Sequence, residues 1–156
     1  MFEGRNDLEK RLVKKLQNYN NPNTLFFVLC DQDLENCVEL KNRLKQKCIN
    51  AGKPDAIIRI ACRSIESFYL GDISSIGRAY GVSLQSHQEK AKYRSPDELN
   101  YPAQTLKELV PQFHKILGAR IIASELDLTK SKSKSFSHFI TALQHAIAIC
   151  KAQGKE

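Results

Sequence analysis

Two short apolar runs predict the centre of the fold. One covers residues 24–30 and the other residues 56–62, and turn-forming or polar residues bound both of them. Uninterrupted runs of this length are typical of strands that are buried on both faces, as in a parallel sheet. Segments with helical spacing precede and separate the two runs, which is typical of α/β proteins with right-handed crossovers. We therefore predict an α/β domain in which helices flank a small parallel sheet.

Helical periodicity predicts the elements around these strands. Residues 7–19 form one amphipathic helix, with Asn6 as its expected N-cap. A helical stretch over residues 65–76 is expected to be interrupted at Gly71–Asp72. The helix that follows the first strand is predicted from five apolar positions, which are Leu34, Cys37, Leu40, Leu44 and Cys48.

The second half of the chain is less regular. Residues 81–104 lose their periodicity, so we expect a long loop there. A helix over residues 106–117 should kink or restart at Pro111 and could end at Gly118, and another short helix can follow near residues 121–126. Residues 129–156 are predicted to form a basic loop and a C-terminal amphipathic helix packed on the domain.

Length and composition favour one soluble domain. A chain of 156 residues is within the usual size of a single domain. It has no apolar run of about 18 residues that could span a membrane, and its N-terminus lacks the apolar region of a secretory signal. The five cysteines are odd in number and irregularly spaced. We expect reduced thiols and a location in the cytoplasm.

The charge of the chain suggests a polyanionic partner. Lysine and arginine number 24 against 17 acids, which gives a net charge of +7. The excess is uneven, because no acid occurs between Thr129 and Lys155. Nucleic acid, DNA or RNA, is the first candidate for such a partner. A net charge of this size is also within the range that serves solubility alone.

Asp31 and Asp33 directly follow the first predicted strand. Ligands of open α/β sheets bind beyond the carboxyl ends of the strands. Strand alternation sends both carboxylates the same way from the backbone, within reach of one Mg²⁺ or Mn²⁺ ion. The alternative is that Asp33 only caps a helix beginning at Leu34. No phosphate-binding glycine loop and no zinc or serine-hydrolase motif accompanies the pair.

The end of the second predicted strand carries further candidates. Parallel strands end at the same edge of a sheet, so Glu66 or Asp72 could approach the two aspartates as a further ligand. Arg63 could hold a phosphate there. The alternative is a surface helix on which Arg63 and Glu66 form an ion pair.

Four cations in predicted loops are candidates for nucleic-acid contacts. They are Lys92, Arg94, Lys132 and Lys134. Side chains of this kind suit the sugar–phosphate backbone. We expect the basic loop at residues 130–134 and the first two cations to form one face beside the acidic site. Ser135 is interpreted as the N-cap of the last helix.

Several stretches, taken in order, resemble a bacterial domain-of-unknown-function family numbered 4276, which is grouped with Toprim-like domains. The resemblance covers nearly the whole chain and rests on residues 2–10, 27–33 with Cys37 and Lys41, 59–63 and 70–72, 93–97 and 133–136. It implies a three-layer, Toprim-like (Rossmann-like) α/β fold. It also implies a component of an antiphage or abortive-infection system, often encoded beside an ATPase. Toprim domains bind magnesium through a glutamate and an Asp-x-Asp motif and act on nucleic-acid backbones.

The chain departs from the family pattern at two places. Family members usually begin with a further strand and helix that carry a Glu-Gly motif, which Glu3-Gly4 imitates without a preceding strand. We therefore expect a form that is truncated at its N-terminus, with Met1 as an internal start. Ser64 stands where the family tends to have glutamate, which removes one possible ligand.

These observations lead to two expectations for function. The first is a metal-dependent nuclease, or nuclease-like subunit of a defence system, in which Asp31 and Asp33 hold the metal and Glu66 assists. The second is a non-catalytic module that binds nucleic acid or a partner ATPase, because the glutamate motif is absent. Association into oligomers is left open.

Overall fold

The computed structural model describes residues 2–21 and 24–152. It divides into two compact units: unit 1 contains the residues up to Ile60 together with those from Phe139 onward, and unit 2 contains residues Ala61–His138. Lys155, which belongs to the predicted basic tail, lies outside the described residues. Within those residues, no helix combines the length and the apolar character needed to cross a membrane.

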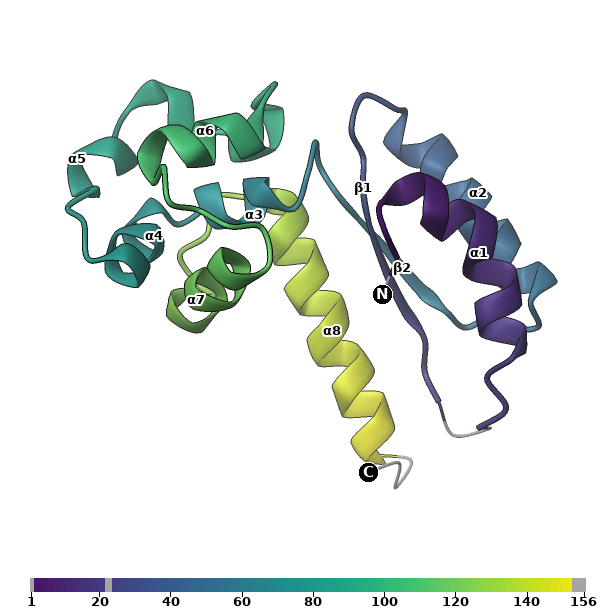
Figure 1. The fold of residues 1–156 in the computed structure, drawn as a ribbon. Coiled ribbons are helices and arrows are strands. Elements are labelled where there is room, and N and C mark those ends of the chain that lie inside the picture. Colours follow the sequence, from purple (N-terminus) through teal and green to yellow (C-terminus); the bar gives the residue numbers. More distant parts are fainter. Residues whose placement is uncertain (1, 22–23, 153–156) are drawn as a thin grey trace. The chain divides into compact units, whose positions relative to one another are not determined.

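Unit 1 is built around a two-stranded parallel sheet (Figure 1). Its elements are α1 (Arg5–Gln17), β1 (Phe27–Asp31), α2 (Cys37–Asn50) and β2 (Ile57–Ala61), whose last residue is assigned to unit 2. Both strands overlap the predicted runs and pair with each other, so the prediction of a mixed α/β chain with a small parallel sheet is confirmed. β1 begins three residues later than predicted, at Phe27, and continues through Asp31.

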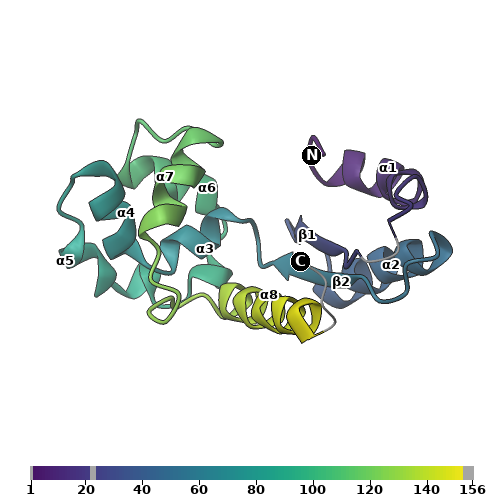
Figure 2. The ribbon, with the colours of Figure 1, turned by 90° about the horizontal axis from the view of Figure 1, so that it is seen from below.

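The core of unit 1 follows from the alternation of side chains along the strands. Val28 and Cys30 of β1 and Ile58 and Ile60 of β2 are buried on one face of the sheet. Helices α1 and α2 lie side by side on that face (Figure 2). They contribute the apolar stripe predicted from the helical spacing, namely Leu8, Leu12, Leu16, Leu40, Leu44 and Cys48. On the other face, Phe27 meets Phe139 edge-on, with their ring centroids 5.4 Å apart.

Unit 2 consists of short helices. They are α3 (Glu66–Leu70), α4 (Ile73–Tyr80), α5 (Gln85–Gln88), α6 (Pro102–Leu109) and α7 (Leu117–Glu125). Helix α3 packs on α6, and α4 packs on α7. The predicted interruption at Gly71–Asp72 is confirmed, because α3 ends there and the Asp72 carboxylate caps α4 by accepting from Ser75 N–H at 3.2 Å.

Residues 81–104 are not the single long loop that their lost periodicity indicated. They contain α5 and the 3₁₀ turns Ala91–Tyr93 and Pro96–Glu98, which are too short to show a repeat. Gly118 does not end a helix but lies in the first turn of α7. A Cβ at this position would come within 2.5 Å of the Phe113 ring and the Tyr80 hydroxyl, so close packing requires the glycine.

Two predicted helix caps are wrong, and so is the alternative in which Asp33 caps a helix. Gly4, not Asn6, precedes α1, and its φ of 98° suits a residue without a Cβ. Asp33 does not cap α2; the side chain of Asn36 does, by accepting from the N–H groups of Val38 and Glu39. The last helix, α8 (Lys134–Ala152), is capped by Ser133, whose Oγ accepts from Phe136 N–H at 3.0 Å, and not by Ser135.

Candidate functional site: two polar clusters that follow the strands

An acidic turn follows β1 in unit 1. Asp31 is the last residue of the strand, and Asp33 has a left-handed backbone with a φ of 54°. Strand alternation therefore ends at Asp31 and cannot set the direction of the second carboxylate. The left-handed region costs a residue with a Cβ about 1–3 kcal/mol and persists only where surrounding contacts hold it. Two arginines from the neighbouring helices supply such contacts.

Arg5 joins the start of α1 to this turn. Its Nη1 donates to the carbonyl oxygen of Gln32 at 2.9 Å. The same atom lies 3.4 Å from Asp33 Oδ2 and 3.2 Å from Glu35 Oε2. The Gln32 side chain also donates to the Glu35 carbonyl oxygen at 2.9 Å. One half-buried guanidinium thus fixes the turn and offsets part of its negative charge.

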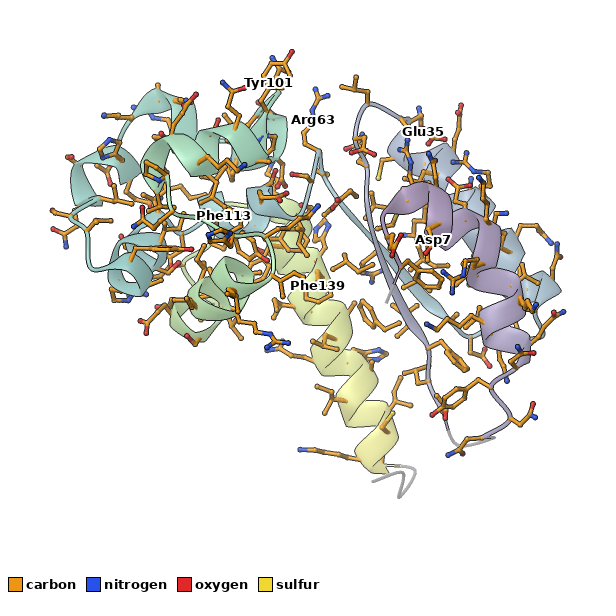
Figure 3. The ribbon with its side chains drawn as sticks, in the orientation of Figure 1. Asp7, Glu35, Arg63, Tyr101, Phe113 and Phe139 are labelled. Carbon is orange, nitrogen blue, oxygen red and sulfur yellow. The ribbon has the colours of Figure 1, made fainter. Side chains whose placement is uncertain are left out.

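Arg43 of α2 makes the second set of contacts. Its Nε and Nη2 donate to the two carboxylate oxygens of Glu9 at 2.8 and 3.0 Å, and its Nη1 lies 2.6 Å from Glu35 Oε1. Bidentate pairing of this kind is geometrically specific. The hydrogen bonds from Arg43 lower the pKa of both Glu9 and Glu35 below their ordinary value of 4.5. Figure 3 shows Glu35 in the segment between β1 and α2.

The lowered pKa values predict how Arg43→Ala responds to pH. A carboxylate with a lowered pKa adds stability above its ordinary pKa of 4.5 and loses it as the pH falls through the lowered value. We expect Arg43→Ala to lower the melting temperature at pH 7, and the gap to the wild type to shrink below pH 4.5. Thermal melts from pH 7 to pH 3 measure this. Lys45→Ala, on the exposed side of α2, is the matched control. If the difference in melting temperature between Arg43→Ala and the wild type did not change with pH, Glu9 and Glu35 would have no part in it.

Asp31 and Asp33 fit a magnesium ion by the chemistry of their oxygens. Magnesium is commonly held by one or two carboxylates together with water and substrate phosphates. The described residues contain no group of three or more acidic, histidine or cysteine side chains placed to hold a metal. A metal at this turn would therefore rely on these two aspartates and on oxygens of its ligand.

A second polar cluster follows β2 in unit 2. Arg63, which Figure 3 shows on the turn after the strand, has a left-handed φ of 63°. Glu66 begins α3 and is only 4% exposed. The hydroxyls of Ser64 and Ser67 are buried without a hydrogen-bond partner in the described part of the chain. The predicted third carboxylate is thus buried in unit 2, whereas Asp31 and Asp33 belong to unit 1.

Asp97 organises this second cluster, and our sequence analysis did not single it out as a site residue. Its Oδ1 accepts from the hydroxyls of Ser133 and Ser135 at 2.6 and 3.0 Å, and its Oδ2 accepts from Ser135 N–H at 2.8 Å. Ser135 Oγ also accepts from Cys62 N–H at 3.3 Å. The carboxylate thus occupies the positive end of α8. The two serines were a visible signal for a helix start, but their partner lies 36 and 38 residues away.

The predicted basic residues do not all remain available to a ligand. Lys92 pairs with Glu108 at 3.1 Å, and Lys130 pairs with Asp127 at 3.0 Å. Lys132 donates to the carbonyl oxygen of Gln88 at 2.9 Å. Arg94 and Lys134 are exposed and form no ion pair within the residues that the structure describes. The basic loop is therefore partly neutralised by its own unit.

Asp72, the other acid after β2, has structural partners. It is 4% exposed, and its Oδ2 accepts from Asp127 N–H at 3.3 Å and lies 3.8 Å from the guanidinium of Arg78. Arg78 also pairs with Glu125 at 3.3 Å. These contacts join the start of α4 to the end of α7, so Asp72 stabilises unit 2.

Comparison with protein families assigns the chain. The family model described as Domain of unknown function (DUF4276) matches residues 4–144. This chain belongs to the DUF4276 family. No curated protein and no solved structure matches it significantly.

The stretches on which the family resemblance rests meet in the two polar clusters of this DUF4276 chain. In unit 1, Arg5 contacts the turn at residues 32–35. In unit 2, Asp97 and the serines that begin α8 meet the Cys62 backbone. Segments far apart in the sequence therefore converge where the strands end, which is where ligands of open α/β sheets bind.

Proposed function

We propose that this DUF4276 chain is a Toprim-like, metal-dependent nuclease or nuclease-like subunit, with Asp31 and Asp33 as the ligands of Mg²⁺ or Mn²⁺. One observation carries the proposal: both acids lie at the carboxyl end of a half-buried parallel strand, and Asp33 keeps a left-handed backbone there. Strained residues cluster at functional sites, where the surrounding contacts hold them in place.

The residues of the chain have separate roles in this proposal. A bound Mg²⁺ ion would polarise a phosphodiester and favour the formation of hydroxide from water. Arg5 positions the turn through the Gln32 carbonyl and Asp33, and Arg43 holds Glu35. Arg63, Arg94 and Lys134 are the cations proposed to contact the nucleic-acid backbone.

The wider setting is proposed from the family resemblance. The resemblance implies a component of an antiphage or abortive-infection system, often encoded beside an ATPase. We propose that this chain works in such a system in the cytoplasm and acts on DNA or RNA. Lys92 and Lys132 could join the contact surface if their present partners, Glu108 and the Gln88 carbonyl, release them.

Thermal stability tests the metal site. Ligand binding to the native state stabilises a protein by RT ln(1 + [L]/Kd), which is about 1.4 kcal/mol at ten times Kd, or about 3–6 °C for a chain of this size. We expect millimolar Mg²⁺ or Mn²⁺ to raise the melting temperature of the wild type by this amount, and Asp31→Ala to abolish the gain. Asp55→Ala removes an exposed acid of the same unit, and this variant should show the same gain in melting temperature as the wild type. An equal gain in all three proteins would disprove binding at Asp31.

A second function, a non-catalytic nucleic-acid or ATPase-binding module, is favoured by Arg5. Its guanidinium lies against Asp33 and Glu35 and supplies positive charge that a metal would otherwise provide. In that case metal leaves the melting temperature unchanged. If the partner is a nucleic acid, its affinity for the chain would still fall steeply as the salt concentration rises. Replacement of Lys130, Lys132 and Lys134 by alanine would also weaken this binding. Metal stabilisation without cleavage by this chain would support a nuclease-like subunit over an active nuclease.

A further inference from the structure

We infer that the outer edge of β1 and the groove beside it bind an extended segment of a partner polypeptide, with apolar residues at alternate positions and acidic residues between them. The segment would add a third strand to the sheet of unit 1. The inference is independent of the proposed metal site, because it uses the edge and the α1 side of β1 and not the turn that follows the strand.

The backbone of β1 has one side without a strand partner. Ile57 N–H of β2 donates to the Phe26 carbonyl oxygen at 2.9 Å, so Phe26 turns its N–H and C=O towards β2. Successive residues of a strand point these groups to opposite sides. Phe27 and Leu29 therefore direct theirs to the outer edge. In the part of the chain that the structure describes, the sheet contains only β1 and β2, so this edge is unpaired.

An apolar groove of about 330 Å³ lies beside this edge, within unit 1. Leu8, Leu12 and Leu16 of α1 line one side of it. β1 contributes Phe27, Val28 and Leu29 to the lining. An unpaired edge of this kind is a ready template for strand addition, in which main-chain hydrogen bonds give affinity and pockets for alternate side chains give specificity. The groove supplies those pockets.

The charges around the groove select an acidic occupant. Among the described residues, Lys15 is the one charged residue of the lining, and its Nζ lies 4.9 Å from the centroid of the Phe2 ring. At the end formed by Tyr19 and Phe26, Lys53 donates to the Tyr19 carbonyl oxygen at 3.2 Å and lies 5.3 Å from the Phe26 ring centroid. No acid belongs to the part of the lining that the structure describes. A second copy of this chain would bring the same lysines together, and we therefore favour a partner segment.

Binding of synthetic peptides to the full chain tests this inference. The probe is a short peptide in which glutamate and valine alternate. One comparison peptide has lysine in place of glutamate, and another has N-methyl groups on the amides that would face β1. We expect the first peptide to bind, as measured by calorimetry or fluorescence anisotropy, and the other two to bind at least about tenfold more weakly, because they lose charge complementarity or main-chain pairing.

Protein variants locate the site. Lys15→Glu and Lys53→Glu should each weaken binding of the glutamate–valine peptide by about tenfold. Lys45→Glu, on the exposed side of α2 and outside the groove, is the matched control and should leave it unchanged. Absence of binding, or equal binding of the N-methylated peptide, would overturn the inference. So would a dimer in light scattering that Lys15→Glu dissociates, because the occupant would then be a second copy.

Discussion

Leu44→Ala should lower the free energy of unfolding by about 2–5 kcal/mol, the range for removing a leucine side chain from a packed core. Leu44 of α2 is fully buried, in a cluster that joins α1, α2 and both strands of unit 1. The substitution removes apolar surface from the core and leaves a cavity that its neighbours cannot fully close. Urea unfolding followed by circular dichroism measures the loss.

Leu34→Ala is the matched control for this prediction. Leu34 lies on the same apolar series in the sequence, but it precedes α2 and is 86% exposed. We expect its replacement to change the free energy of unfolding by less than about 0.5 kcal/mol. Similar losses for Leu34→Ala and Leu44→Ala would contradict the position of α2 described above.

Asp97→Ala should cost about 2–3 kcal/mol, because the carboxylate accepts three hydrogen bonds at the start of α8. The buried Ser133 hydroxyl would lose its acceptor, and the helix would lose a negative charge at its positive end. For a chain of this size the expected decrease in melting temperature is about 4–12 °C. Thermal denaturation followed by circular dichroism measures it.

Two further substitutions separate the network from a general effect of lost charge. Glu98→Ala removes the neighbouring, exposed acid and should have little effect. Asp97→Asn keeps one acceptor oxygen and should fall between the wild type and Asp97→Ala. If Asp97→Ala were as stable as Glu98→Ala, the contacts to Ser133 and Ser135 would have no part in stability.

Local sequence patterns located the longer elements of this fold but not the shortest ones. Uninterrupted apolar runs located β1 and β2, and helical spacing located α1, most of α2 and the break between α3 and α4. These signals are readable because a strand or a helix repeats its burial every two or 3.6 residues. Where an element is a single turn, as in α5, no repeat exists to be read, and a loop was expected instead.

The candidate site was predictable only in part, for the same physical reason. The Asp31–Asp33 pair was recognisable from its place after an apolar run, and the family from the order of its stretches. The direction in which the Asp33 side chain points was not predictable. It depends on a left-handed backbone held by Arg5, which lies 28 residues earlier in the chain. The sequence also did not show that Arg43 binds both Glu9 and Glu35.

The sequence by itself determined the α/β class, the two strands, the buried stripe of α1 and α2, and membership in the DUF4276 family. Only the tertiary structure decided which residues cap the helices, which lysines are already paired, and where β1 keeps an open edge. Local periodicity is a property of neighbouring residues, so one strand or one helix is enough to express it. Charge pairing, capping and edge exposure depend on partners tens of residues away, which only folding brings within a few ångströms.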